Sequence, residues 1–538
     1  MTDPSTDSII QTKICAISWN EFSITQQDMD FYAKISPTFA GQVFHIPTPT
    51  LCPEERERRR LSFRNERNLY RRTCDATGKE IISIYSPDKP YKVYDQKIRW
   101  SDSRDPMDYG REFDFNKTFT EQFSELMKDV PAVALVNEYT KQENCGYVNS
   151  AWPGKNCYLS YEFGFCEDVL YSKSIRNSNT SIDCMHSTEL SSCYECVDCA
   201  NCYACFNSQY CDDCSFCTWC YNCKNCQYCI NCDWLENKSY CIENKQYASK
   251  EEFEQAARKY VYKPREKNIL ENGKVHTNEN AHNVKNVVKS KNVAHTHDGL
   301  NLENVKYGWD IVDTKDTYDY FSWWENVSLC YEMQESWRWV NKSAFLYVCW
   351  DNIANAYYSF SCINSSDIFG CVWVRNKQYC IFNKQYTKNE YEKIVAKIIT
   401  HMQETWERGE FFHPSLSPFG YNETVAQDHY PLQDPHTSRK DAQWRQAWYK
   451  RSTYQKPEPK VDKIIPWEKL PTIWCTDIDT QNSQFLEDII KYAIKCEITG
   501  KLFRIIPQEI TFYKKHNLPL PRRHPDQRHV DRLALRNK

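Results

Sequence analysis

From Cys193 to Cys232 a cysteine stands at every third position, and Ser208 is the only interruption. Four upstream cysteines keep the same three-residue phase: Cys145, Cys157, Cys166 and Cys184. A period of three fits neither the 3.6-residue period of an α-helix nor the two-residue period of a flat strand. It is typical of a chain that turns a corner every few residues, as β-solenoids do, with equivalent side chains stacked between turns. The array therefore predicts a β-rich, cysteine-rich, β-solenoid-like core, and it leaves the length of one turn open.

The end of this array occurs a second time in the chain. Residues 232–247 and 371–386 share their Cys and Trp positions and the run Asn-Lys-Gln-Tyr. Each copy leads into a helix-like stretch that opens with Ser249 or Thr387 and has an acid three residues later, the pattern of a capping box. We therefore expect two homologous solenoid lobes, residues 141–247 and 301–386, with a capping helix over 387–412 after the second.

Short segments that begin with Asn or Asp recur in the second lobe, namely residues 304–307, 316–319, 326–329 and 352–355. Asn and Asp favour turns because their side chains bond to nearby backbone and tolerate unusual backbone angles. We expect these residues at the corners of the solenoid and their apolar neighbours inside it.

Two stretches read as exposed connections between these parts. Residues 248–300 contain the first helix and then a region, from 262, that is rich in Lys, Asn and His, which predicts an exposed insertion. Residues 413–472 hold eight prolines and predict an extended connector, docked in part by Trp444, Trp448 and Tyr449.

The two ends of the chain share one sequence skeleton, which predicts related modules over residues 1–73 and 473–538. The thirteen identities are Cys15/Cys496, Ile17/Ile498, Phe22/Phe503, Ile24/Ile505, Phe31/Phe512, Tyr32/Tyr513, Lys34/Lys515, Pro53/Pro525, Arg56/Arg528, Arg60/Arg532, Leu61/Leu533, Arg64/Arg536 and Asn65/Asn537. The run that starts at Cys74 repeats the one at Cys496, which predicts a second knuckle-like module and a connector over residues 74–140.

These modules resemble zinc ribbons that have kept half of their ligands. A structural zinc needs four N or S donors in two pairs, each on a tight turn. The first module keeps Cys15 and Cys52, and the last keeps Cys496 and His524. Zinc is the one cofactor that the sequence allows, and three further residues could complete a site: Cys74, Cys475 and His529. The alternative, which the pattern favours, is a ribbon that has lost its metal and is held by packing of its phenylalanines.

Arginines crowd the helix-like part of both terminal modules. The candidates for binding are Arg56, Arg59, Arg60, Arg64, Arg522, Arg523, Arg528, Arg532 and Arg536. Guanidinium groups bind phosphate in a bidentate manner, and phosphate contacts supply most non-specific affinity for nucleic acid. Because the same positions recur in both modules, the pattern predicts a nucleic-acid-binding face. A solvated charged helix is the alternative.

The cysteine array itself admits three interpretations: metal coordination, disulfides, or a ladder of reduced thiols inside the solenoid. Aromatic residues such as Tyr194, Phe216 and Trp219 alternate with the thiols, unlike the usual composition of metal-storage proteins. Cysteine is a small, readily buried side chain that packs well against rings. The composition therefore favours the thiol ladder.

Composition sets the compartment and excludes several classes of function. The chain has 538 residues and 28 cysteines, which is too long to need disulfides for stability, so we expect reduced thiols in a cytoplasmic protein, with secretion as the alternative. The formal net charge is −4, and no run of eighteen apolar residues indicates a membrane span. Phosphate-binding loops and hydrolase or metalloprotease motifs are missing, so the sequence predicts a protein that is not an enzyme.

Several runs together resemble a family of cysteine-rich, zinc-ribbon-like repeat proteins from candidate phyla radiation (Patescibacteria-like) bacteria. The matching runs are residues 52–66, 81–89, 108–115 and 524–529 and both Asn-Lys-Gln-Tyr elements. In that family the N-terminal module looks like a complete four-cysteine ribbon, and this chain departs from it at Ser18 and Glu55. The resemblance implies an organisation of modules and a bacterial source, and no activity.

The leading hypothesis is a cytoplasmic nucleic-acid-binding protein, directed to RNA or the ribosome, with arginine-rich ends on a rigid solenoid. The first alternative is a scaffold whose aromatic solenoid face binds a protein. Its motivation is the tryptophan set Trp323, Trp324, Trp337, Trp339, Trp350 and Trp373. The third hypothesis is metal binding or buffering by the cysteine array.

Overall fold

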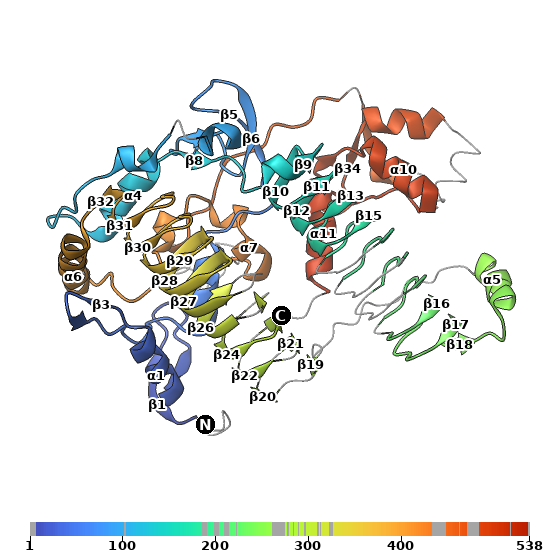
Figure 1. The fold of residues 1–538 in the computed structure, drawn as a ribbon. Helices are drawn as coiled ribbons and strands as arrows, with labels where there is room; N and C mark the ends of the chain where they lie inside the picture. Colours follow the sequence, from blue (N-terminus) through green and yellow to red (C-terminus); the bar gives the residue numbers. More distant parts are fainter. Residues whose placement is uncertain are drawn as a thin grey trace. The chain divides into compact units, whose positions relative to one another are not determined.

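The computed structural model of the chain divides into two compact units (Figure 1). Unit 1 joins residues 1–134 to 272–453, and unit 2 joins residues 135–271 to 454–538. Each unit thus combines one end of the chain with one lobe from its middle. The structure describes residues 7–101, 104–185, 191–197, 204–208, 215–221, 223–260, 275–276, 279–282, 285–288, 290–294, 297–308, 311–312, 314–321, 326–432, 448–461, 463–470, 484–516 and 518–535.

The middle of each unit is a β-solenoid, which confirms the fold predicted from the cysteine period. Neighbouring turns pair in parallel, and a residue pairs with the one twelve positions later, as Tyr161 does with Lys173 and Val287 with Gly299. In the widest part of the second lobe the step is thirteen residues, as between Val327 and Val340. The period of three therefore gives four short sides to a turn.

Corners recur at every third residue, because every third residue adopts the left-handed backbone conformation. From Asn156 to Asp183 each third residue has a φ between 44° and 58°. Asn and Asp enter this region most readily among residues with a side chain. Asn352 lies at such a corner and its amide donates to Asn364 of the next turn at 3.2 Å. The prediction that Asn and Asp occupy the corners, with apolar neighbours such as the buried Ile353 inside, is confirmed.

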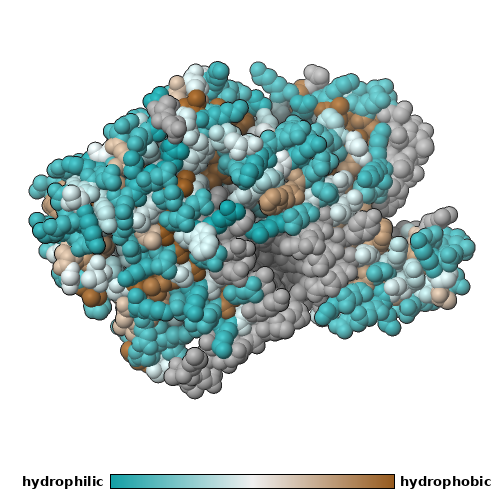
Figure 2. All heavy atoms as spheres, viewed as in Figure 1, coloured by the Kyte–Doolittle hydropathy of each residue, from teal (hydrophilic) through white to brown (hydrophobic). Residues whose placement is uncertain are grey.

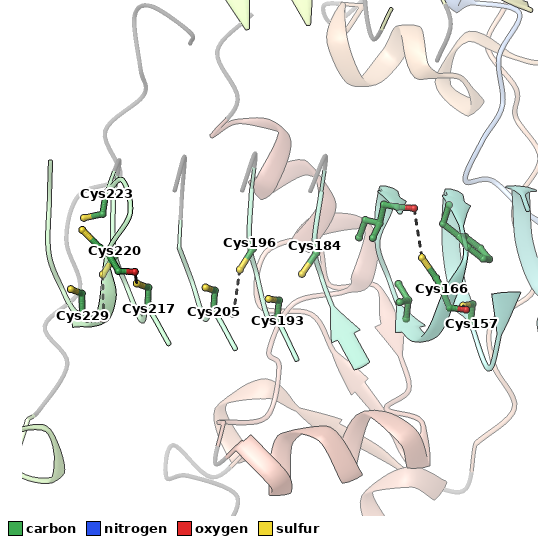
Figure 3. Close-up of a cluster of buried hydrophobic side chains, with 14 of the residues drawn as sticks. Cys157, Cys166, Cys184, Cys193, Cys196, Cys205, Cys217, Cys220, Cys223 and Cys229 are labelled. Atoms are coloured by element: carbon green, nitrogen blue, oxygen red, sulfur yellow. Dashed lines mark hydrogen bonds between the residues drawn. The ribbon is translucent and has the colours of Figure 1, made fainter. Parts of the chain in front are cut away.

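The inside of each turn takes the residue two positions before a corner. Only one residue in three faces inward and the turn is narrow, so the interior selects small side chains. In the first lobe these are mostly cysteines, and Figure 3 shows them stacked along the inside of successive turns. The four array members Cys199, Cys202, Cys211 and Cys214 lie outside the described residues.

Inward thiols and hydroxyls make the same two contacts with backbone carbonyl groups. Cys166 Sγ lies 3.3 Å from the carbonyl oxygen of Gly164 and 3.6 Å from that of Ile175 in the next turn. Ser208, the interruption in the array, donates to the equivalent carbonyl groups of Phe206 and Cys217 at 3.1 and 3.2 Å. The cysteines that the structure describes are free thiols, so this part of the array forms a core ladder.

Lobe 1 (residues 142–246) belongs to unit 2. Its strands are β9 (Gln142–Glu143), β10 (Tyr147–Ala151), β11 (Gly154–Lys155), β12 (Tyr158–Gly164), β13 (Cys166–Leu170), β14 (Lys173–Arg176), β15 (Asn179–Ile182), β16 (Gln227–Ile230), β17 (Ser239–Ile242) and β18 (Lys245–Gln246). Helix α5 (Lys250–Arg258) follows, and its first turn is capped by Ser249 as predicted.

Lobe 2 (residues 275–385) belongs to unit 1. Its strands are β19 (Val275–His276), β20 (Glu279–His282), β21 (Lys285–Val288), β22 (Lys291–Ala294), β23 (His297–Leu300), β24 (Glu303–Lys306), β25 (Ile311–Val312), β26 (Thr314–Phe321), β27 (Val327–Trp337), β28 (Val340–Trp350), β29 (Ile353–Tyr357), β30 (Ser366–Phe369), β31 (Gln378–Ile381) and β32 (Lys384–Gln385). Helix α6 (Lys388–Glu404) follows, and Thr387 and Glu390 form the predicted capping box.

The terminal modules repeat one order of elements: strand, cysteine turn, strand, helix, helix. The N-terminal module has β1 (Ile9–Ile14), β2 (Glu21–Thr25), α1 (Gln26–Ile35), β3 (Thr38–Phe39), β4 (Gln42–Val43) and α2 (Pro53–Leu61). The C-terminal module has β33 (Ile464–Pro466), β34 (Ala493–Lys495), β35 (Leu502–Phe503), α10 (Pro507–His516) and α11 (Pro525–Leu533).

The remaining elements of unit 1 surround lobe 2. They are β5 (Tyr70–Thr73), β6 (Glu80–Ser83), β7 (Val93–Tyr94), α3 (Gln96–Arg99), α4 (Phe119–Asp129), β8 (Ala132–Val133) and α7 (Val425–His429). Short 3-10 helices add Pro106–Tyr109, Pro414–Leu416 and Tyr421–Glu423 to unit 1, and Tyr139–Lys141, Trp467–Lys469 and Ile489–Lys491 to unit 2.

Both predicted connections are corrected in part. The described residues between 275 and 300 form solenoid turns rather than an exposed insertion, since β21 already pairs with β19 and β23. Their polar composition misleads because two residues in three face outward. The predicted connector over 413–472 includes buried Leu416, Tyr421 and Tyr449, so its first part packs within unit 1, while Trp444 lies outside the described residues.

Candidate functional site

The arginines of the N-terminal module lie buried against lobe 2. Arg56 Nε donates to Asp319 at 2.9 Å, and Arg60 lies 3.3 Å from the other carboxylate oxygen of Asp319. The guanidinium of Arg56 also lies over the ring of Tyr307, with 5.4 Å to its centroid. Tyr307 and Asp319 both occupy solenoid corners, one turn apart. One corner carboxylate thus holds two arginines of one helix, α2.

The C-terminal module docks on lobe 1 with the same geometry. Arg528 and Arg532, one helical turn apart on α11, both donate to Asp183, the second at 2.7 Å. Arg528 lies over the ring of Tyr171, with 4.5 Å to its centroid. Tyr171 is again the corner one turn before the aspartate. The residues that the N- and C-terminal modules share are therefore the ones that dock each module on a solenoid lobe.

Aromatic residues of the skeleton complete both docking faces. Tyr32 packs against Tyr331 of lobe 2 with ring centroids 5.3 Å apart, and Tyr513 packs edge-on against Tyr194 of lobe 1 at 5.9 Å. Phe31 stacks on Tyr318 at 3.9 Å. These contacts bury the rings together with the arginines.

At both docking sites the buried arginines form ion pairs with buried carboxylates. Burial by itself would lower the pKa of Arg56, but the carboxylate of Asp319 holds that pKa well above its ordinary value. Arg528 shows the same raised pKa, with Asp183 opposing the effect of burial. Burial raises the pKa of the neighbouring Glu509 carboxyl, although Arg528 acts in the opposite direction. The arginines stay charged and are neutralised inside the protein.

The remaining members of the predicted basic face are also paired or lie elsewhere. Arg59 donates to Glu332 and Glu410 at 2.6 Å each, and Arg64 pairs with Glu66 and Glu335. Arg522 lies over Trp467, Arg523 is 43% exposed and bridges Glu497 and Asp531, and Arg536 lies outside the described residues. The predicted nucleic-acid-binding residues Arg56, Arg59, Arg60, Arg64, Arg528 and Arg532 are buried and form no accessible face in this structure. Nucleic-acid binding stays a prediction without these side chains to carry it.

Three cysteine turns share one geometry. The amides of Cys15, Cys74 and Cys496 each bond to the carbonyl oxygen five residues later. The fifth residue of each turn is left-handed: Gly78 and Gly500 satisfy this without strain, and Trp19 adopts it with a φ of 57°. The three turns thus share one backbone geometry, and the relationship between the three modules stays a prediction.

Polar groups lie beside the cysteines of the first and the last of these turns. Ser18 Oγ lies 3.6 Å from Cys52 Sγ, and a hydrogen bond from the Cys52 thiol lowers the pKa of Cys15. Cys496 contacts Thr499 and the backbone of His524. Among the residues that the structure describes, no group of three or more His, Cys, Asp or Glu side chains could hold a metal ion. Cys74 lies in its own turn, His529 is buried in α11, and Cys475 is outside the described residues. Zinc binding stays a prediction.

The duplicated Asn-Lys-Gln-Tyr element closes the last turn of each lobe. Asn383 presents its side-chain amide to the backbone of Val372, accepting from its N–H and donating to its carbonyl group at 2.8 Å each. Asn244 does the same to Asp233 at 2.9 and 3.0 Å. The amide side chain stands in for the peptide group of a further turn, which satisfies the exposed strand edge.

The end of lobe 2 is covered by residues 99–113 of the same unit. The guanidinium of Arg99 lies over the ring of Trp373, with 5.1 Å to its centroid, and Trp100 packs edge-on against the same ring. Asn383 donates to the carbonyl group of Pro106 at 3.0 Å, and Phe113 stacks on Phe382. As a result, Trp373 is only 3% exposed.

In the part of the chain that the structure describes, the matching end of lobe 1 is more open, although the hydroxyl of Tyr260 donates to Glu243 there at 3.1 Å. Trp234, the counterpart of Trp373, is 63% exposed, although it packs edge-on against Tyr221. Asn244, the counterpart of the fully buried Asn383, is exposed. Sequence reasoning missed this contrast because it treated the two copies as equivalent.

The tryptophans that motivated the scaffold hypothesis are divided. Trp350 and Trp373 are buried and Trp339 is exposed. Trp323 and Trp324 lie outside the described residues, as does the side chain of Trp337. On the face drawn in Figure 2, the coloured residues are mainly hydrophilic.

Comparisons of the chain with protein families, with curated proteins and with solved structures found no match. The family resemblance described above therefore stays a prediction. Of the helices in the described residues, none is long and apolar enough to cross a membrane.

Proposed function

We propose that this chain is a non-enzymatic scaffold that binds a protein partner through the exposed aromatic surface of lobe 1. The contrast between two homologous tryptophans carries the proposal. Trp373 is covered by its own unit, whereas Trp234 keeps the same place at the end of a solenoid and is 63% exposed. Tryptophan is highly buried on average and is enriched at the energetic centres of protein interfaces.

A second row of aromatic rings lies along lobe 1, at a corner half a turn away from the corner of Trp234. Phe216, Tyr228 and Tyr240 occupy equivalent corners of successive turns and stack with centroids 4.7 and 5.5 Å apart. Phe253 of α5 packs against the last two of them, and Phe216 is 39% exposed. Rings that are fixed on a rigid solenoid lose little conformational entropy when a partner binds.

The charges of the molecule favour a protein over nucleic acid as the partner. The skeleton arginines neutralise carboxylates inside the two units. Around Trp234 the nearby charged positions include the acids Asp233, Glu236 and Glu243. Nucleic-acid affinity depends on cations that release counterions from phosphates, and carboxylates oppose it.

Affinity purification from the source cells under reducing conditions tests the proposal. Tagged wild type is compared with Trp234→Ala and with Trp406→Ala, which removes another tryptophan, 94% exposed, from unit 1. We expect one protein to co-purify with wild type and with Trp406→Ala and to be lost with Trp234→Ala. Co-purification of nucleic acid alone, stripped by moderate salt, would overturn the proposal, and so would equal recovery of the protein in all three samples.

A further inference from the structure

We infer that the open end of lobe 1 binds a partner segment that places an arginine over Trp234 and pairs it with the surrounding carboxylates. This inference rests on the proposed protein-binding function and names the chemistry of the partner. The open end consists of Asp233, Trp234, Glu236, Glu243 and Asn244. The occupant is deduced from the way in which unit 1 covers its own copy of this surface.

Unit 1 supplies the template for the bound state. Arg99 covers Trp373 by a cation–π contact and also donates to the carbonyl group of Trp373 at 3.4 Å. Trp100 follows at once in the sequence and packs edge-on against the ring of Trp373, and Arg375 lies over the ring of Trp100. An arginine followed by a large aromatic residue therefore fits the end of a lobe.

The end of lobe 1 differs in charge from the end of lobe 2, which residues 99–113 cover. Val372, Arg375 and Phe382 of lobe 2 are replaced in lobe 1 by three acids, Asp233, Glu236 and Glu243. The end of lobe 1 thus carries three negative charges where lobe 2 carries one positive charge, while the lysines at 238 and 245 match those at 377 and 384. Lobe 1 consequently favours a more basic cover than the one in unit 1.

The tryptophan and the amide stand at the same places in both lobes, whereas Asp233, Glu236 and Glu243 are found in lobe 1 alone. Asn383 uses one N–H of its amide for Val372 and the other for the carbonyl group of Pro106 in the cover. Asn244 donates to Asp233 in the same way, and its exposed side chain can offer its second N–H to a backbone carbonyl group of a partner. The retained ring and amide together with the acids point to an arginine-bearing peptide.

Two short peptides provide the probe. The first copies residues 96–100, Gln-Lys-Ile-Arg-Trp, with acetyl and amide ends, and the second replaces its lysine and arginine by glutamate. Binding to the full chain is measured by saturation-transfer NMR and fluorescence anisotropy. The full-chain variants are Trp234→Ala, Glu236→Arg, which restores the residue of lobe 2, and Trp406→Ala as the matched control.

We expect the basic peptide to bind wild type at least tenfold more tightly than the acidic peptide. Trp234→Ala should weaken its binding at least fivefold and Glu236→Arg at least threefold, and Trp406→Ala should leave it unchanged. Equal binding of the two peptides would overturn the inference, and so would binding that survives Trp234→Ala. Self-association of wild type that Trp234→Ala abolishes and the basic peptide does not inhibit would identify a second copy of the chain as the occupant and also overturn it.

The two proposals fail in different ways. Loss of a co-purifying protein in Trp234→Ala, combined with a peptide that shows no preference for charge, would sink the arginine inference and leave the scaffold intact. Charge-selective binding of the peptide at Trp234 with only nucleic acid co-purifying would support the chemistry of the end and overturn the scaffold.

Discussion

The carboxylate of Asp319 accepts a hydrogen bond from Arg56 at 2.9 Å, and both side chains are buried. The same relationship joins Arg528 to Asp183 in the other unit. Each aspartate is a left-handed corner residue of the solenoid, so its carboxylate projects where a helix can dock. The end modules are alike because they solve the same docking problem twice, and each grips the lobe that lies farther from it in the sequence.

The two asparagine caps differ in burial, which gives a matched pair of variants. Asn383→Ala should destabilise unit 1 by about 2–3 kcal/mol, because the buried backbone of Val372 loses both of its partners. Asn244→Ala should cost unit 2 less than about 1 kcal/mol, because water can replace the exposed amide. Urea unfolding, monitored by hydrogen exchange in each unit separately, measures the difference between the two variants. Equal costs for the two variants would show that the amides do not act as caps.

The thiol ladder predicts a graded response at Cys166. Serine keeps both carbonyl contacts, as Ser208 does elsewhere in the array, so Cys166→Ser should cost only about 1 kcal/mol. Cys166→Leu adds volume to a narrow interior and should cost about 1–3 kcal/mol through overpacking. Thermal unfolding of the two variants under reducing conditions measures the order. A greater loss for serine than for leucine would contradict this account of the interior.

The first cysteine turn should accept zinc after a single substitution. Ser18 Oγ lies 3.6 Å from Cys52 Sγ, beside Cys15, so Ser18→Cys brings three thiols together, and water can supply the fourth zinc ligand. We expect the variant to bind one more zinc ion per chain than wild type and Ser18→Ala do, measured by elemental analysis after equilibration with zinc and gel filtration. An unchanged metal content would mean that the turn no longer has the geometry of a metal site.

Acid should destabilise unit 2 in part through His524. Burial lowers the pKa of His524, and its Nδ1 accepts the capping hydrogen bond from Asp526 at 3.1 Å, which requires a neutral ring. An unfolded histidine has a pKa of about 6.5. The contribution of His524 to the free energy of unfolding should therefore be complete above that pH and should decrease as the pH drops below it. His524→Asn keeps a cap and should reduce the fall between pH 7.5 and 5.5, measured by urea unfolding. An identical fall in both proteins would contradict the assignment.

The solenoid could be predicted from the sequence because its physical cause is local. A corner at every third residue leaves one inward position in three, so the cysteine period alone indicates the fold. The turn length could not be read from the array, because an unbroken period of three looks the same for any number of sides. The Lys- and Asn-rich turns before residue 300 were missed since their inward positions lack cysteine.

The docking sites were beyond sequence reasoning for a different reason. The skeleton identified Arg56, Arg60, Arg528 and Arg532 correctly as residues that act together, but the carboxylates that neutralise them lie far away in the chain. An arginine run looks the same whether its counter-ion is a phosphate or a buried aspartate. The signal that could have separated the two is the presence of a tyrosine twelve residues before an aspartate in each lobe, as with Tyr171 and Asp183.

A double-mutant cycle between Asp183 and Arg532 tests most directly that the skeleton arginines fasten each module to a solenoid. The variants Asp183→Asn, Arg532→Gln and their combination are unfolded in urea, beside a control cycle at the partly exposed pair Arg523 and Asp531. We predict a coupling energy of about 2 kcal/mol or more for the buried pair and less than about 1 kcal/mol for the control. A coupling at Asp183 and Arg532 no larger than that of the control would contradict the account.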